Sequence, residues 1–190
     1  MLDSNYALID NDFLNHAIET KLDEKSKCDL LNSIFDVLKK DPVIHPWISD
    51  YEVMWENKTV KNVVSKTKIQ KATWDDIHGN QMAQKKYYEI LFKELFKKTH
   101  GSPISANDIF TYCVKKQSLG ELHNISACMI CGCNLILSDD EDTKRFKKMI
   151  SQTMTCDFEV YTRDELAESI RGLEGAPRRS ELKKFAHVAH

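Results

Sequence analysis

Two short apolar runs, far apart in the chain, each end in acidic residues. Residues 6–9 (Tyr-Ala-Leu-Ile) are followed by Asp10, and residues 135–137 (Leu-Ile-Leu) are followed by Ser138 and the pair Asp139-Asp140. Short continuous apolar runs are typical of strands buried on both faces, as in parallel sheets. In α/β proteins the carboxyl ends of parallel strands lie along one edge, where ligands bind. The sequence therefore predicts that Asp10 and Asp139 are neighbours at that edge.

Amphipathic segments before, between and after these runs predict helices. They cover residues 12–22, 29–40, 81–99, 105–116, 120–131, 140–151 and 163–171, with a short helix expected after Ser49 and extended segments at 43–48 and 158–162. The alternation predicts an α/β fold, a three-layer α/β/α sandwich with a short parallel sheet of about four or five strands.

The chain has 190 residues, which suits a single domain. We expect residues 1–172 to form this domain, with a basic helical insertion at about 57–117, and residues 173–190 to form a polar C-terminal tail. In the insertion, residues 57–78 mix lysines with β-branched residues and predict an elaborated or mobile segment.

Several protein classes are excluded by composition. No apolar stretch reaches the length of about 20 residues that a membrane span needs. The N-terminal segment has no Lys or Arg before Lys21, so it lacks the positive start of a secretory signal. We therefore expect a cytoplasmic protein without a membrane partner. Its six cysteines, including Cys128-Met-Ile-Cys131-Gly-Cys133, are expected to be reduced and buried, because no second pair stands at zinc-site spacing.

Charge is distributed unevenly along the chain. The formal net charge is −2, yet residues 57–100 contain ten lysines and only four acidic residues. A basic segment of this kind attracts phosphate groups, and Trp74, Tyr87 and Tyr88 within it offer rings on which bases can stack. The same segment also fits a plain solvated helix face.

A third acid joins the two strand ends. Glu121 lies at the start of the predicted helix that leads into the run 135–137, and an antiparallel return brings this helix start to the edge of Asp10 and Asp139. Clustered carboxylates raise each other's pKa, and a divalent cation relieves the repulsion. Oxygen ligands favour Mg²⁺ or Mn²⁺ over zinc.

Two stretches resemble the PIN-domain ribonucleases. One is Ala7-Leu-Ile-Asp10-Asn-Asp-Phe-Leu14. The other joins Gly120-Glu121 to Ala127-Cys-Met-Ile-Cys-Gly-Cys-Asn-Leu-Ile-Leu-Ser-Asp139-Asp140, and it resembles the branch in which a Gly-Glu pair opens a helix and a strand closes on Ser-Asp-Asp. The resemblance covers residues 1–56 and 118–165, whereas 57–117 is longer and more basic than a compact member requires.

The resemblance implies an endoribonuclease that hydrolyses RNA phosphodiester bonds with Mg²⁺ or Mn²⁺. It implies catalytic roles for Asp10, Glu52, Glu121 and Asp139, and metal ligation by Asp10, Glu121, Asp139 and Asp140. Glu52 is included because residues 43–52 resemble the segment that carries a further family acid. The lysines expected to hold RNA are Lys66, Lys68, Lys71, Lys85 and Lys86. Family habit adds a toxin-like or defence role, a protein antitoxin or regulator, and a homodimer.

Alternatives stay open at several positions. One acid of the Asp139-Asp140 pair is expected to cap the following helix, and we prefer Asp139 as the ligand, with Asp157 in reserve. His123 is the one histidine close enough in sequence to Glu121 to warrant a test. Two other function classes compete: a catalytically impaired RNA-binding or scaffold module, and a phosphatase-like hydrolase using the spacing Asp10-Asn-Asp12.

Overall fold

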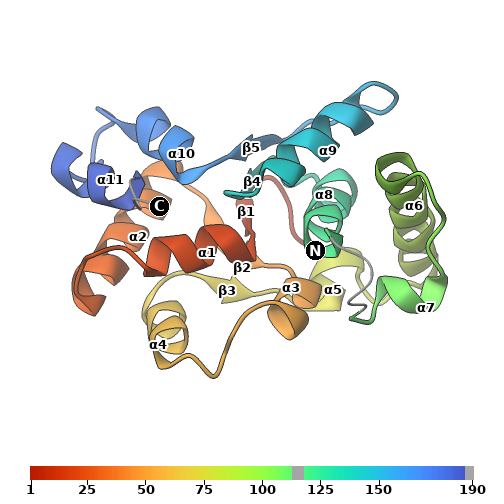
Figure 1. Ribbon diagram of the computed structural model, residues 1–190, viewed down its shortest axis with the longest axis horizontal. Helices are drawn as coiled ribbons and strands as arrows, with labels where there is room; N and C mark the ends of the chain where they lie inside the picture. Colours follow the sequence, from red (N-terminus) through yellow and green to blue (C-terminus); the bar gives the residue numbers. More distant parts are fainter. Residues whose placement is uncertain (113–117, 187–190) are drawn as a thin grey trace.

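A five-stranded parallel sheet lies at the centre of the protein (Figure 1). The computed structural model describes residues 1–112 and 118–186. The strands are β1 (Tyr6–Ile9), β2 (Asp41–Ile44), β3 (Gln70–Lys71), β4 (Leu135–Leu137) and β5 (Glu159–Tyr161), in the order β3-β2-β1-β4-β5. The predicted α/β fold with a short parallel sheet is confirmed.

The three central strands end at the same level. Ile9 of β1 is opposite Ile44 of β2 on one side and Leu137 of β4 on the other. The residues that follow, Asp10 and Ser138 among them, therefore leave the sheet side by side at its carboxyl edge. Residues 7–9 are fully buried, which explains why β1 is apolar throughout rather than alternating.

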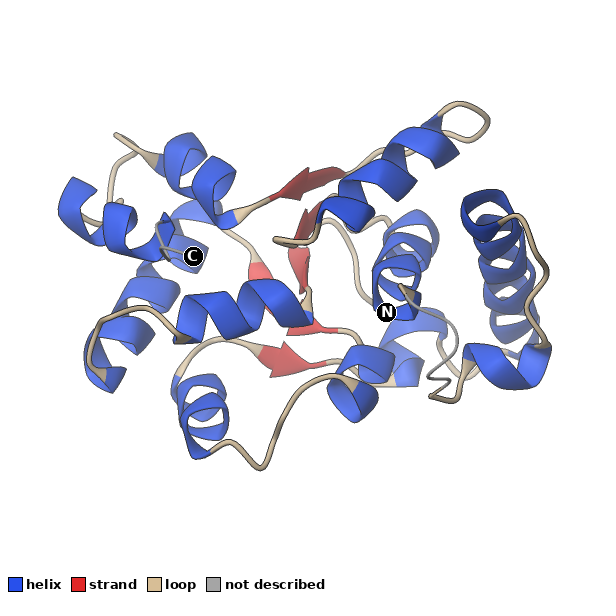
Figure 2. Ribbon diagram, viewed as in Figure 1, coloured by secondary structure: helices blue, strands red, loops and turns tan. Residues whose placement is uncertain are grey.

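Helices cover both faces of this sheet (Figure 2). One group lies to the left in the view and comprises α1 (Asn11–Ile18), α2 (Glu24–Leu38), α4 (Lys58–Lys66), α10 (Arg163–Ile170) and α11 (Arg179–Ala186). The other lies to the right and comprises α5 (Trp74–His78), α6 (Met82–His100), α8 (Leu119–Cys131) and α9 (Glu141–Ser151). The short helices α3 (Pro46–Tyr51) and α7 (Ala106–Ile109) lie toward the lower right.

Helix α8 is the most deeply buried helix that carries a predicted site residue. It contacts β1 and β4 on one side and α6 on the other, so residues 122–128 are buried on every face. Apart from His123, Asn124 and Ser126 this stretch is apolar, which suits a helix that is buried on every face. It ends at Gly132, whose φ of 74° is the left-handed conformation that glycine adopts without steric cost. The start of α8 is thereby held rigidly against the sheet.

The basic segment 57–117 is more closely integrated than predicted. It contributes the edge strand β3 and the helices α4 to α7, and Val60, Val63 and Val64 of α4 are buried. Strand β3 consists of the exposed pair Gln70–Lys71, so it carries no apolar pattern that sequence inspection detects. The helix predicted over 105–116 is α7, which ends at Ile109; residues 113–116 of that prediction lie outside the described residues.

Two other boundaries differ from the predictions. Helix α3 begins at Pro46, with His45 as the capping residue, rather than after Ser49, because proline suits the first helical position. Residues 179–186 of the predicted polar tail form α11, whose Leu182 and Phe185 are buried; residues 187–190 lie outside the described residues. The ring of Phe185 packs edge to face on Phe13 of α1 at 5.9 Å. The last helix is therefore part of the core.

Within residues 1–112 and 118–186, none of the helices combines the length and apolarity needed to span a membrane.

Candidate active site

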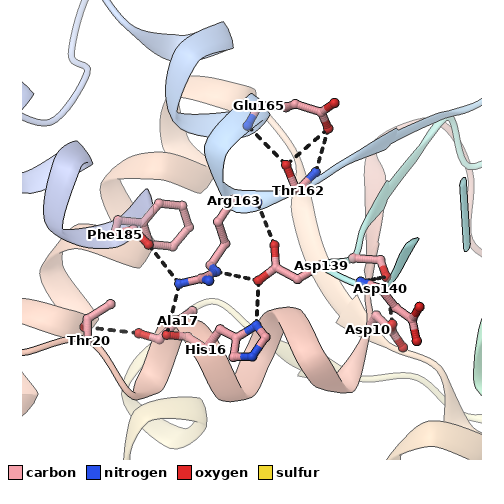
Figure 3. Close-up of polar contacts among 11 residues, drawn as sticks. Asp10, His16, Ala17, Thr20, Asp139, Asp140, Thr162, Arg163, Glu165 and Phe185 are labelled. Atoms are coloured by element: carbon pink, nitrogen blue, oxygen red, sulfur yellow. Dashed lines mark hydrogen bonds and ion pairs between the residues drawn. The ribbon is translucent and has the colours of Figure 1, made fainter. Parts of the chain in front are cut away.

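Ser138 ties the end of β1 to the end of β4. The Asp10 N–H donates to Leu137 O at 2.9 Å, and the Ser138 hydroxyl donates to Asp10 Oδ2 at 2.8 Å. Because its only proton goes to Asp10, that hydroxyl accepts hydrogen bonds from the Asp140 N–H at 3.2 Å and from the Thr143 hydroxyl at 3.0 Å. Ser138 thus fixes Asp10 and Asp140 next to each other. Figure 3 shows these two acids side by side.

Glu52 and Glu121 approach this pair from two helices. Glu121 lies in the first turn of α8, and Glu52 is the residue that ends α3. The Glu52 carboxylate rests against Gly120: a Cβ at that position would lie 2.6 Å from Glu52 Oε1 and 2.8 Å from Oε2. Only glycine permits this approach. The Gly-Glu pair therefore has a physical basis, since residue 120 makes room for one acid and residue 121 supplies another.

The carboxyl groups perturb one another. Burial raises the pKa of Asp10 to about 7, with nearby Asp12 and Asp140 adding to the effect and the Ser138 hydrogen bond opposing it. Burial, followed by the charge of Asp10, raises the pKa of Glu52 to about 8 and that of Glu121 to about 9. Without a cation, this cluster holds protons near neutral pH.

Asp12 is an acid that the ribonuclease prediction did not assign. It lies in the first turn of α1, and burial together with the charge of Asp140 raises its pKa. Its spacing from Asp10 is the one considered for a phosphatase-like site. Here it serves as an outer member of the carboxyl cluster, more exposed than Asp10.

Asp139 faces away from the cluster, which corrects the expectation that it meets Asp10. Its Oδ1 accepts the Arg163 N–H at 2.9 Å, and its Oδ2 contacts Arg163 Nε and His16 Nδ1, the latter at 2.9 Å (Figure 3). Arg163 is itself 8% exposed in its side chain and also donates to Phe185 O at 3.0 Å. A buried arginine demands such a partner. In this structure, Asp140 takes the place beside Asp10 that we assigned to Asp139.

Asp140 combines two roles in one side chain. Its Oδ1 accepts the N–H of Asp142 at 2.7 Å, so it is the N-cap of α9. The same side chain lies close enough to raise the pKa values of Asp10, Glu52 and Glu121. The expectation that one acid of the pair caps the helix and the other faces the site therefore does not hold, because Asp140 does both.

The chemistry of the cluster fits a hard divalent cation. Carboxylate oxygens are the ligands of Mg²⁺ and Mn²⁺, and the buried Oε2 of Glu121 has no hydrogen-bond partner among the described residues. Across residues 1–112 and 118–186, however, no three His, Cys, Asp or Glu side chains are grouped as closely as a metal shell requires. Mg²⁺ usually keeps several waters and takes only one or two carboxylates directly, which accommodates this wider spacing.

The predicted RNA-binding lysines fall into two groups. Lys66 pairs with Glu24 at 2.5 Å and Lys68 pairs with Asp36, so both attach the α4 region to α2. Lys71 ends β3 opposite Ile44, at the carboxyl edge, and its Nζ lies 3.4 Å from the centre of the Trp55 ring. Lys85 and Lys86 lie on α6 beside a pocket described below. Lys71, Lys85 and Lys86 are thus better placed for a ligand than Lys66 and Lys68.

Asp157 lies on the opposite side of the sheet from the cluster. It is exposed and comes just before β5, which places it at the amino edge of the sheet.

The cysteines among the described residues are free thiols, namely Cys28, Cys128, Cys131, Cys133 and Cys156. Cys113 lies outside the described residues.

A buried chain of hydrogen bonds joins the helices that carry Glu52 and Glu121. His45 Nδ1 accepts the Trp47 N–H at 3.1 Å, and His123 Nε2 contacts Ile109 O at 2.9 Å. These contacts set the neutral tautomers: His45 Nε2–H donates to the Tyr88 hydroxyl at 3.3 Å, which in turn donates to His123 Nδ1 at 2.7 Å. Burial lowers the pKa of both histidines, that of His123 to about 3. His123 is therefore a satisfied core residue.

Ser138 and Arg163 are the polar site residues that sequence inspection missed. Ser138 belongs to the Ser-Asp-Asp pattern, for which only the acids were predicted to have a role. Its position between a buried strand and two acids is the sequence feature that indicates its role at the site. Arg163 follows the strand next to β4 and starts α10, where a positive charge at a helix N-terminus is unfavourable. An arginine at such a place indicates that a specific anion holds it there.

Comparisons of the chain with protein-family models, with curated proteins and with solved structures find no significant match.

Proposed function

We propose that this protein is an endoribonuclease of PIN-like type that uses Mg²⁺ or Mn²⁺ to hydrolyse RNA. The observation that carries the proposal is the gathering of Asp10, Glu52, Glu121 and Asp140, from four separate parts of the chain, at the carboxyl edge of a parallel sheet. Buried acids that raise each other's pKa cost stability, so a site that retains them is a functional candidate.

Asp10, Glu121 and Asp140 would hold the cation directly or through its bound waters, with Glu52 beside them. Asp10 is the inner ligand because it is 3% exposed and fixed by Ser138. The bound ion supplies charge to stabilise the phosphodiester transition state and lowers the pKa of the attacking water. Glu52 would accept a proton from that water, because the charge of the cation would keep its carboxyl group ionised.

Lys71 is the cationic residue of the described strands, and it ends β3 at the same edge as the acids. It leaves β3 at the same edge and stays over the ring of Trp55 without an acidic partner among the described residues. A negatively charged site repels phosphate, so a cation beside it is needed to hold the RNA backbone. The toxin-like or defence role, the antitoxin or regulator and the homodimer belong to this proposal through the sequence resemblance alone.

Metal binding and cleavage test the proposal separately. Titration of the chelator-treated protein with Mn²⁺, followed by the electron paramagnetic resonance of free Mn²⁺, is expected to show saturable binding that Asp10→Asn removes. Incubation with single-stranded RNA is expected to give cleavage with Mg²⁺ or Mn²⁺ and none with chelator. RNA binding without cleavage in any of these ions overturns the nuclease proposal and favours the non-catalytic RNA-binding module.

A further inference from the structure

A pocket of about 820 Å³ opens between α5, α6 and the end of α7, away from the acidic cluster. Its volume lies within the range of small-molecule sites. Its lining includes Trp74, Met82, Ala83, Lys85, Lys86 and Phe110. Met82 is 79% exposed, so this apolar lining faces solvent rather than the core.

Two aromatic rings at the pocket are held rigidly. Trp74 and Phe110 meet edge to face at 5.2 Å with an interplanar angle of 76°. Behind them Trp74 packs edge to face on His45 at 5.1 Å and on Tyr88 at 5.8 Å, and these two belong to the buried hydrogen-bond chain. Preorganised aromatic side chains bind planar groups at low entropic cost, and unpaired nucleobases are such groups.

The pocket also carries unneutralised positive charge. Glu89 lines it too, but this carboxylate pairs with Lys93 on the same helix. Among the described residues, no acidic side chain pairs with Lys85 or Lys86. Lysines at the edge of an aromatic pocket provide the charge complementarity that a nucleic-acid strand needs.

An aromatic surface connects this pocket with the acids. The Tyr51 hydroxyl donates to Phe110 O at 3.2 Å, and Tyr51 directly precedes Glu52 in the chain. The rings of Tyr51 and Tyr112 stack at 6.1 Å with an interplanar angle of 26°, and the residues are 40% and 57% exposed. Exposed stacked tyrosines therefore lie between Glu52 and the pocket.

We propose that the Tyr51–Tyr112 stack and the pocket at Trp74 and Phe110 form a binding track for unpaired RNA, in which the pocket takes one nucleobase and Lys85 and Lys86 contact its phosphates. This inference rests on the proposed function and narrows its substrate to single strands. Bases in a duplex are paired and stacked on each other, so they cannot enter the pocket.

Binding measured without cleavage tests the track. Fluorescence anisotropy with a labelled single-stranded RNA in chelator is expected to give affinity that Lys86→Glu weakens by about tenfold. Lys97→Glu is the matched control, because Lys97 is an exposed lysine of α6 that does not line the pocket, and it should change affinity less than about twofold. The same RNA annealed to its complement should bind more weakly than the single strand. Equal effects of the two substitutions, or tighter binding of the duplex, overturn the proposal.

A scan with abasic nucleotides locates the base pocket. Replacing one nucleotide at a time by an abasic unit in an otherwise fixed RNA is expected to lower affinity most at one position. Ala83→Phe fills the pocket from an exposed helix position, and in this variant the abasic effect at that position should disappear. Glu94→Phe, exposed on the same helix and not lining the pocket, should leave the scan unchanged. A scan without a preferred position in the wild-type protein argues against a base pocket.

The two proposals fail in different ways. Pocket-dependent binding of single strands without cleavage in Mg²⁺ or Mn²⁺ supports the track and rejects the nuclease. Metal-dependent cleavage that Lys86→Glu and Ala83→Phe leave unchanged supports the nuclease and rejects the track.

Discussion

The carboxylates of Asp139 and Asp140, adjacent in the chain, serve different parts of the structure. Asp139 accepts the Arg163 N–H and contacts its guanidinium and His16, whereas Asp140 lies beside Asp10 and caps α9. The exit of β4 is thus anchored on one side by an ion pair, which leaves the next side chain directed at the acidic cluster. We infer that Asp139 is a positioning residue.

Asparagine substitutions of these two neighbours should have opposite consequences. Asp139→Asn leaves the buried Arg163 guanidinium without its counter-charge and should lower the free energy of unfolding by about 3 kcal/mol, measured by urea denaturation. Asp140→Asn preserves the helix cap and should change stability by less than about 1 kcal/mol, while Mn²⁺ affinity and RNA cleavage fall by about 100-fold.

A second substitution checks the cause of the Asp139 effect. Arg163→Met added to Asp139→Asn removes the unpaired charge and should restore part of the lost stability. If Asp139→Asn is as stable as the wild type but inactive, Asp139 belongs to the metal site and the positioning role is refuted.

Asp10→Asn should stabilise the metal-free protein while abolishing cleavage. In the folded chain the pKa of Asp10 is raised to about 7 from a usual value near 4, so the folded state binds more protons than the unfolded state between these pH values. The contribution of Asp10 to the free energy of unfolding is therefore fully present below about pH 4 and is lost as pH rises through 7. In chelator, the variant should be more stable than the wild type by about 1–3 kcal/mol at pH 8 and nearly equal to it at pH 4. Thermal unfolding at both pH values measures this, and a variant that still cuts RNA contradicts the assigned site.

Gly120→Ala should displace Glu52 without unfolding the protein. The added Cβ would lie 2.6 Å from Glu52 Oε1, so that side chain must move, whereas alanine suits a helix interior better than glycine. We expect an unchanged or higher melting temperature together with a fall in cleavage rate of about tenfold or more. Glu52→Asp shortens the displaced side chain, and the double variant should recover some activity relative to Gly120→Ala. Wild-type activity in Gly120→Ala would show that the position of Glu52 is unimportant.

The hydrogen-bond chain through Tyr88 predicts loss of stability in acid. The pKa values of His45 and His123 are lowered by burial, so the unfolded state binds more protons below about pH 6.5. Stability from these groups is present above this pH and is lost as pH falls toward 3. Urea denaturation of the wild type and His123→Leu between pH 7 and 5 isolates this contribution, because the raised carboxyl pKa values act equally in both proteins. As pH falls, the free energy of unfolding of the variant should gain relative to that of the wild type, whatever their difference at pH 7. If the free energy of unfolding has the same pH dependence in His123→Leu as in the wild type, protonation of His123 does not contribute to it.

The sheet was predictable because its central strands are buried on both faces. Residues 6–9 and 135–137 have no alternating pattern, and that absence identifies parallel strands. Strand β3 was not predictable, since Gln70 and Lys71 are exposed at the sheet edge and owe their conformation to pairing with β2. Helix α11 was hidden for a similar reason: only Leu182 and Phe185 reach the core from a strongly charged segment.

The sequence predicted that acidic residues gather at the carboxyl edge of the sheet. It did not predict which acidic side chain of the Asp139-Asp140 pair lies beside Asp10. Asp10 and Glu121 follow from a strand end and a helix start, which the sequence indicates, whereas Glu52 came from the family resemblance alone and lies at the end of α3. The choice between Asp139 and Asp140 depends on which of them Arg163 engages, and that contact spans 24 residues of sequence. Local patterns contain no information about such a contact.

The bond between Ser138 and Asp10 also bears on the order of folding. It joins positions 128 residues apart, and the remaining acids come from two further segments. Closing so long a loop is slow, because its entropy cost is offset only by the contacts that form once β4 has docked beside β1. A chain stalled before that step lacks the gathered acids, so under the proposed function Mn²⁺ affinity is expected to appear during refolding only with the native topology.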